Sequence, residues 1–65
     1  MTLDKARQLL QVQVDFGGGY NRNSARLILA EVVREHGQAD ANKLISELRL
    51  DEIFGISPVP IQHHI

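Results

Sequence analysis

Three consecutive glycines, Gly17, Gly18 and Gly19, divide the chain and limit what can lie on either side of them. Each glycine costs roughly 0.5–1 kcal/mol inside a helix or strand, so this run and the asparagines after it are expected to form a connection. The segment before the run then decides the class of fold. A strand, a glycine loop and a helix in that order can bind phosphate, whereas two helices joined by glycines form part of a helical bundle.

Residues 2–15 are predicted to form a helix. Thr2 is a favourable N-cap, and Asp4 lies in the first turn, where the helix dipole favours negative charge. Helical spacing is shown by Leu3, Ala6, Leu10 and Val14. A strand at residues 9–16 stays open as an alternative, because apolar and polar residues alternate strictly there. We favour the helix because a strand needs a pairing partner, and the only other extended candidate is the proline-containing tail.

Two further helices are predicted at residues 23–36 and 39–49, with a short helical turn near residues 51–54. Asn23 or Ser24 is expected to cap the first of them, and Gly37 to end it. Its apolar positions follow the spacing of three and four residues typical of an amphipathic helix. They are Ala25, Ile28, Leu29, Val32, Val33 and His36, broadened by Leu27 and Ala30. Such a wide apolar stripe indicates contact on more than one side of the helix.

Residues 56–65 are predicted to be extended, because Pro58 and Pro60 fix their own backbone angles and disfavour helix in the residues before them. This segment, called the arm below, is also apolar. An apolar tail favours packing, either over its own helices or on a neighbouring subunit, over disorder. The predicted fold is an all-α, compact three-helix bundle, in which residues 1–55 form a single helical domain and residues 56–65 an extended arm.

Self-association is expected because the chain is short and has no cysteine. A domain of 65 residues buries only about 60% of the surface of its unfolded chain. Disulfides, a structural metal or a partner subunit commonly stabilise such domains, and the missing cysteines exclude disulfides and thiolate zinc sites. We therefore predict a homodimer that also binds another protein. The predicted association surface consists of Leu29, Val33, Ile45, Ile56, Val59 and Ile61.

The charge pattern bears on partners and location. The net charge of −1 argues against a strongly basic nucleic-acid binder and a polybasic membrane patch. No apolar run approaches the ~18 residues of a membrane span, and the first ten residues do not resemble a signal peptide. We therefore expect a cytoplasmic protein without a membrane partner. Positive charge nevertheless gathers locally, because residues 16–30 contain Arg22 and Arg26 and no acid.

The glycine loop and the helix start after it are the predicted contact site for an anion or a partner. Glycines let a backbone approach a ligand closely, and helix N-termini present N–H groups. Arg22 and Arg26 oppose the helix dipole there, which favours an anionic ligand or an acidic patch on a partner. The predicted contact residues are Gly18, Gly19, Tyr20, Asn21, Arg22, Asn23 and Arg26. In the alternative interpretation, the glycines only make the turn, and the arginines pair with Asp15 or with acids on another helix.

No catalytic residue, metal site or cofactor is predicted. The chain has no cysteine nucleophile, and its serines fit a cap, a helix surface and a turn. His63 and His64 are adjacent, and adjacent histidines seldom bind one metal with good geometry. The glycine loop lacks the Gly-Lys-Ser/Thr ending of a phosphate loop and the spacing of a dinucleotide fingerprint. A chain this short also has little room for a water-excluding pocket.

The predicted function is therefore a small non-enzymatic interaction or regulatory module that self-associates. The alternative is a dimeric DNA-binding transcriptional regulator. With a strand ending at Phe16, the layout resembles the ribbon-helix-helix repressors, and Gln11 and Gln13 would face the bases. The chain departs from that family in the nine residues before the strand and in its long glycine loop. A helix-turn-helix version would place the helix beginning NRNSAR in the major groove.

A second resemblance involves the residues around the glycine loop and the third helix. Gly19 to Ala25, followed by Leu29, Gly37, Ala41 and Ile45, is similar to the glycine-aromatic loop and small third helix of ubiquitin-associated three-helix domains. The similarity covers about half the chain, and the second helix here is about one turn longer. The resemblance implies a three-helix fold, and no binding residues are carried over from it.

Overall fold

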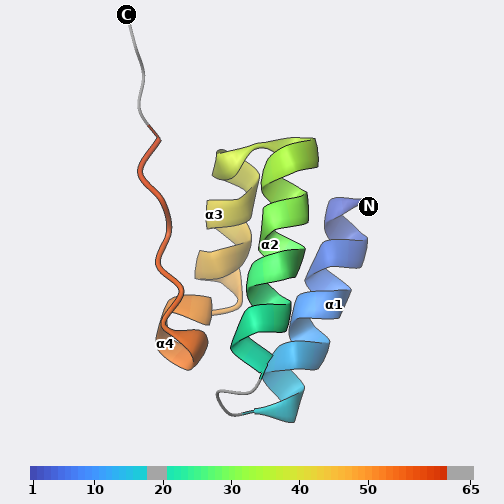
Figure 1. The fold of residues 1–65 in the computed structure, drawn as a ribbon, viewed down its shortest axis with the longest axis vertical. Coiled ribbons are helices and arrows are strands. Elements are labelled where there is room, and N and C mark those ends of the chain that lie inside the picture. The colour runs from blue at the N-terminus through green and yellow to red at the C-terminus, as the bar shows by residue number, and fades with distance from the viewer. Residues whose placement is uncertain (18–20, 62–65) are drawn as a thin grey trace, which may run out of the picture.

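Four helices follow one another in the computed structural model, which describes residues 1–17 and 21–61. They are α1 (Leu3–Phe16), α2 (Arg22–His36), α3 (Gln38–Glu47) and α4 (Leu50–Phe54). Helix α2 packs between α1 and α3 and runs antiparallel to both (Figure 1). The predicted all-α bundle is confirmed, and the described residues contain no strand. No helix in this part of the chain is long and apolar enough to cross a bilayer.

Residues 9–16 are helical, so the strand interpretation was wrong. Thr2 caps α1 as predicted, because its Oγ1 accepts a hydrogen bond of 3.1 Å from the Lys5 amide. The alternating apolar pattern arises because α1 buries only some of its apolar residues. Leu10 is fully buried, whereas Val12 is 47% and Phe16 74% exposed. Pairing of two copies through a β-ribbon at these residues is therefore excluded.

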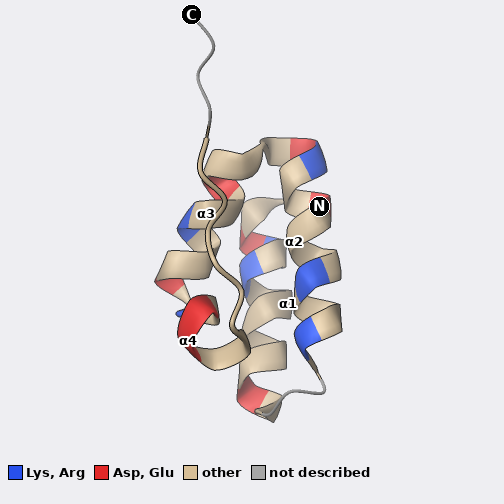
Figure 2. Ribbon diagram, turned by 60° about the vertical axis from the view of Figure 1, so that its left-hand side comes forward, with Lys and Arg blue, Asp and Glu red and all other residues tan. Residues whose placement is uncertain are grey.

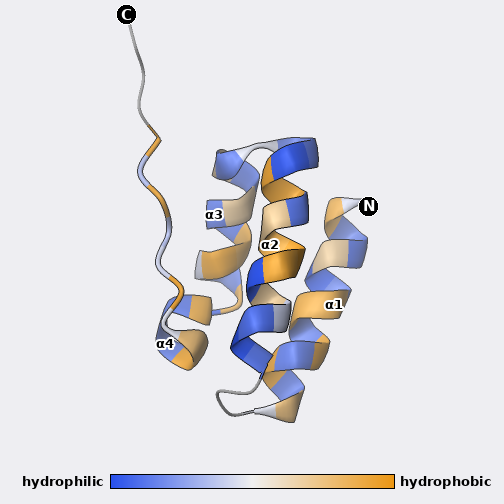
Figure 3. Cartoon of the chain, viewed as in Figure 1, coloured by the Kyte–Doolittle hydropathy of each residue, from blue (hydrophilic) through white to orange (hydrophobic). Residues whose placement is uncertain are grey.

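The core is made of small aliphatic side chains from all four helices, with one aromatic. The described part of the chain buries no polar side chain. The buried residues are Ala6, Leu10, Ala25, Leu29, Val32, Ala41, Leu44, Ile45, Leu50 and Phe54. Hydrophobic and hydrophilic residues alternate along each helix, as expected when one side of an amphipathic helix is buried (Figure 3).

The start of α2 differs from the prediction. The helix begins at Arg22 with Asn21 as N-cap, so neither Asn23 nor Ser24 occupies the cap position. The Asn21 side chain makes no capping hydrogen bond and instead donates to the Gln13 carbonyl at 3.2 Å. This contact joins the beginning of α2 to the end of α1. A tertiary contact has thus replaced the local cap that the sequence indicated.

A single residue, Gly37, connects α2 to α3. It is the C-cap of α2 and the N-cap of α3, and its backbone angles of φ 97° and ψ 165° belong to a region used almost only by glycine. Its N–H donates to the Val33 carbonyl at 3.0 Å. Because one residue reverses the chain, α3 begins at Gln38, one residue earlier than predicted.

The third helix ends earlier than predicted, at Glu47 instead of residue 49. Arg49 is left-handed, with φ 56° and ψ 41°, and is the only non-glycine residue with positive φ in the described segments. The chain therefore turns before Leu50, whose side chain is fully buried in the core. The predicted helical turn near residues 51–54 is α4, and Arg49 occupies its N-cap position.

The arm lies along α3, as far as the structure describes it. After Gly55, residues 56–61 are extended and return past the length of α3 (Figure 1). Ile56 packs against the core, and the Val59 backbone makes two hydrogen bonds with the Asn42 side chain. Of the two alternatives that the sequence left open, this part of the arm therefore follows the first and lies on the chain's own helices. His63, His64 and Ile65 lie outside the described residues.

Candidate binding groove

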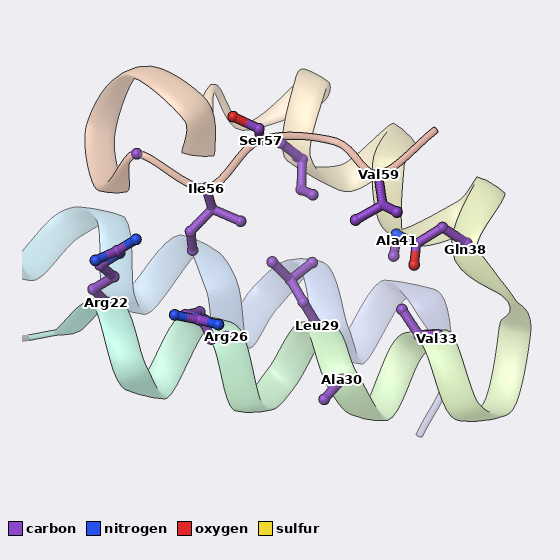
Figure 4. A pocket seen from close by; sticks show the side chains of 12 residues that line it. Arg22, Arg26, Leu29, Ala30, Val33, Gln38, Ala41, Ile56, Ser57 and Val59 are labelled. Carbon is purple, nitrogen blue, oxygen red and sulfur yellow. The ribbon is translucent and has the colours of Figure 1, made fainter. Parts of the chain in front are cut away.

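The two sites predicted from the sequence meet at one hollow between α2, α3 and the arm (Figure 4). Its volume is about 320 Å³, at the lower end of the range for ligand pockets. We call this hollow the groove. Its lining consists of Arg22, Arg26, Leu29, Ala30, Val33, Gln38, Ala41, Ile45, Gly55, Ile56, Ser57 and Val59.

Five of the six residues predicted as an association surface line the groove. They are Leu29, Val33, Ile45, Ile56 and Val59. Leu29 and Ile45 are buried in the core, so they form the floor of the groove and are no outward-facing surface. Val33 and Val59 are exposed at its sides, while Ile61 lies further along the arm, is exposed and does not line the groove. Leu29 and Ile45 therefore have little surface available for association, and the association surface itself stays a prediction.

Arg22 and Arg26 line the end of the groove nearest the start of α2, beside Ile56 (Figure 4). Both are exposed, and neither forms an ion pair with any residue in the described segments. Asp15, which the sequence offered as their partner, accepts a hydrogen bond of 2.9 Å from Gln11. Basic residues and no acidic ones occupy the first half of α2 (Figure 2). The alternative in which acids of this chain neutralise the two arginines is thus not seen in the described part.

The ion pairs of the described residues all lie outside the groove. Arg7 contacts Asp4 at 2.8 Å and also Glu47, which joins α1 to the end of α3. The hydrogen bond and charge of Glu47 raise the pKa of Arg7 above its usual range. The hydrogen bond from the N-terminal amine lowers the pKa of Glu35. Because no acid lines the groove, its charge is of one sign.

Arg34 and His36 are also engaged at the far end of α2. Arg34 pairs with Glu31 within the helix, and His36 Nε2 lies 2.8 Å from the Met1 carbonyl oxygen. The latter contact joins the end of α2 to the N-terminus of the chain. The two ends of α2 therefore differ. Arg34 and His36 contact other groups at one end, whereas Arg22 and Arg26 at the other end form no ion pair within the described residues.

Asn42 is the functional candidate that sequence reasoning missed. Its Nδ2 donates to the Val59 carbonyl at 2.7 Å, and its Oδ1 accepts from the Val59 amide at 2.9 Å. Gln38 Nε2 also donates to Asn42 Oδ1 at 2.9 Å and so orients the amide. Asn42 is a polar residue within the helix predicted at residues 39–49. No sequence signal separates it from an ordinary surface asparagine, because only the folded arm brings a backbone to it.

The structure describes only some of the remaining predicted contact residues. Gly18, Gly19 and Tyr20 lie outside the described residues. Asn23 is exposed and lines a second, shallow hollow on α2 together with Arg26, Leu27 and Ala30. Among the described residues, no three histidine, aspartate or glutamate side chains come together as a metal site would require.

The fold and the groove together define a small all-helical protein in which an extended arm and two helices enclose an apolar groove with a basic end. Comparisons with protein-family models, curated proteins and solved structures give no match. The resemblance to ubiquitin-associated domains therefore carries no argument about function, and a proposed function rests on the geometry alone.

Proposed function

We propose that this chain is a small non-enzymatic protein-protein interaction module that self-associates through the exposed side of α2. One observation carries the proposal: exposed apolar side chains lie along α2 beside two arginines without acidic partners in the described residues. Leu27 is 71% exposed, and Ala30 and Val33 are also exposed. Single exposed apolar residues are normal, but several on one helix together with unpaired charge favour a partner surface.

A second copy of the chain is the proposed occupant of this side of α2. Leu27 and Ala30 line the same shallow hollow, so a large side chain stands next to a small one. In a two-fold pair of α2 helices, Leu27 of each copy would pack over Ala30 of the other, since such an interface is self-complementary. Association would also bury apolar surface that a disulfide-free domain of this size leaves exposed.

Sedimentation velocity tests this proposal. We expect the wild-type chain to form a dimer in the micromolar range, and Leu27→Glu to weaken dimerisation at least about tenfold, because a charge would be buried in the interface. Phe16→Glu is the matched control, since Phe16 is as exposed as Leu27 but lies at the end of α1. A wild-type monomer at 100 µM, or equal effects of the two substitutions, would contradict self-association through α2.

DNA binding is the second candidate, and Arg22, Asn23 and Arg26 favour it because they are exposed on the acid-free half of α2. Of the two DNA-binding arrangements considered, the helix-turn-helix one remains, because residues 9–16 are helical. The net charge of −1 is low for a DNA-binding protein. A gel shift at low salt provides the test. If α2 contacts phosphates through these arginines, affinity should fall steeply with salt, and Arg22→Ala should weaken binding and lower the salt slope by about 1. The absence of any shift would leave the protein-interaction role.

A further inference from the structure

The arm shows what kind of segment the α2 and α3 side of the groove binds, because the arm forms the opposite wall. Residues 56–61 are extended and contain the sequence Pro58-Val59-Pro60. Ile56 and Val59 line the groove, and Asn42 binds both the N–H and the carbonyl of Val59. A segment with a proline every second residue is preorganised in an extended form, so little conformational entropy is lost when it binds. The groove therefore already has the features of a site for extended peptides.

Asn42 recognises the backbone of residue 59 and not its side chain. Proline has no N–H, so Val59 offers the only backbone donor between Pro58 and Pro60. A single amide side chain satisfies that donor and the carbonyl of the same residue. This contact therefore selects a register in which a residue with an N–H lies between two prolines, and leaves the side chain at that position open.

The basic end of the groove is not used by the arm. Arg22 and Arg26 line the groove next to Gly55 and Ile56, and neither of these two residues can neutralise a guanidinium (Figure 4). An arginine presents its donors in a fixed fork that fits a carboxylate. A ligand that carried carboxylates just before the apolar segment would therefore gain contacts that the chain's own arm cannot make.

We propose that the α2 and α3 wall of the groove is a recognition site for an extended Pro-X-Pro segment of a partner protein, which takes the place of the arm and has acidic residues directly on its N-terminal side. The chain's own arm is the weaker, intramolecular ligand of this wall. Asn42 sets the register on the backbone, the apolar residues of α2 and α3 take the side chains, and Arg22 and Arg26 select the acidic residues. This inference rests on the proposed role as an interaction module, but it does not require self-association.

Competition with the arm sets the expected affinity. A segment tethered by a short linker behaves as if it were present at roughly millimolar concentration. A free peptide must therefore compete with this effective concentration of the arm before it binds. Acidic residues would shift this balance toward the partner. The arm would thereby keep the apolar residues of α2 and α3 covered until an acidic Pro-X-Pro segment displaces it.

Two synthetic peptides test the proposal on the full-length chain. DDISPVPI matches the arm but has acids before the isoleucine, and NNISPVPI is its neutral counterpart of the same size. Amide shifts are followed by NMR during each titration, at low salt. We expect both peptides to move the signals of Val59 and the Asn42 side chain, and the acidic one to bind about fivefold more tightly. In the double variant Arg22→Gln, Arg26→Gln the ratio should fall to about one.

Controls separate the two recognition elements. Arg34→Gln lies on the same helix but pairs with Glu31 outside the groove, so it should leave the ratio unchanged. Asn42→Ala should weaken both peptides equally, while Lys43→Ala, its exposed neighbour on α3, should weaken neither. The comparison of the two peptides on the wild-type chain needs no variant, so the proposal stays testable if a substitution prevents folding.

Four results would overturn the proposal. One is equal binding of the acidic and neutral peptides, and another is the absence of shifts at Val59 and Asn42 at millimolar peptide. The third is a shift of these signals with protein concentration alone, which would assign the groove to the arm of a second copy. A DNA duplex that moves the Arg22 and Arg26 signals more than the acidic peptide does would likewise assign the basic end to nucleic acid. Sedimentation decides self-association separately, so the two proposals can fail independently.

Discussion

Replacing Leu10 by alanine is expected to lower the free energy of unfolding by about 2–5 kcal/mol. Leu10 is one of the largest side chains that are fully buried, and it lies in the middle of α1. The substitution removes apolar contacts and leaves a cavity that the neighbouring helices can only partly fill. A domain of this size has a free energy of unfolding on the order of 5 kcal/mol, so most of its stability is at risk.

Thermal and urea unfolding followed by circular dichroism measure this effect. In a domain of this length, 1 kcal/mol corresponds to roughly 4–8 °C in Tm, so the midpoint should fall by about 10 °C or more. Val12→Ala is the matched control on the same helix, because Val12 is half-exposed and alanine is the better helix former. A Leu10→Ala midpoint within a few degrees of the Val12→Ala midpoint would contradict the assigned core.

Replacing Gly37 by alanine is expected to cost about 1–3 kcal/mol. A Cβ at this position would meet no atom within 4 Å, so steric crowding by neighbours contributes nothing. The cost comes from the backbone, because φ 97° with ψ 165° is a conformation that side chains with a Cβ rarely adopt. With one residue joining α2 and α3, no neighbouring position can absorb the strain without changing how the helices pack.

Gly55 provides the comparison for this second experiment. It also has positive φ, but its angles of 68° and 25° lie in the left-handed helical region, which asparagine tolerates. Gly55→Asn should therefore cost less than about 1 kcal/mol in urea unfolding. If Gly37→Ala were no more destabilising than Gly55→Asn, the one-residue connection would have to adopt another conformation in solution.

The position of Gly37 also has a consequence for the groove. Gln38, the first residue of α3, orients Asn42 through a hydrogen bond of 2.9 Å, and Asn42 binds the arm. A change in how α3 leaves α2 would move this pair relative to Val33 and Arg26 on α2. Loss of the Asn42 contact with Val59 in Gly37→Ala would appear as faster exchange of the Val59 amide, so stability and the site are linked at this turn.

Sequence signals predicted the ends of the helices well where residues close together in the sequence form the cap or the turn. Thr2 caps α1, Gly37 ends α2, and the proline-containing tail is extended as far as it is described. The boundaries were wrong where a tertiary contact replaced a local one. Asn21 bonds to Gln13 instead of capping α2, and left-handed Arg49 ends the third helix early so that Leu50 can be buried.

The candidate site was predicted in two separate pieces. The sequence singled out Arg22 and Arg26 as positive charges without nearby acids, and the apolar positions of two helices and the arm as a surface for association. It contained no signal that these sets share one groove, since residues 22 and 59 are far apart along the chain. Asn42 was missed for the same reason, because an asparagine on a helix surface is ordinary until a backbone lies against it.

Composition and periodicity by themselves determined that this chain is helical, lacks covalent cross-links and has a basic spot at the start of its second helix. These properties depend on residue type and on neighbours within one or two turns, which the sequence lists directly. Only the tertiary structure decided which apolar residues are buried in the core and which stay exposed, because both kinds follow the same helical spacing. The course of the arm along α3 helps to decide which of these residues are covered. That course depends on contacts between residues distant in the sequence.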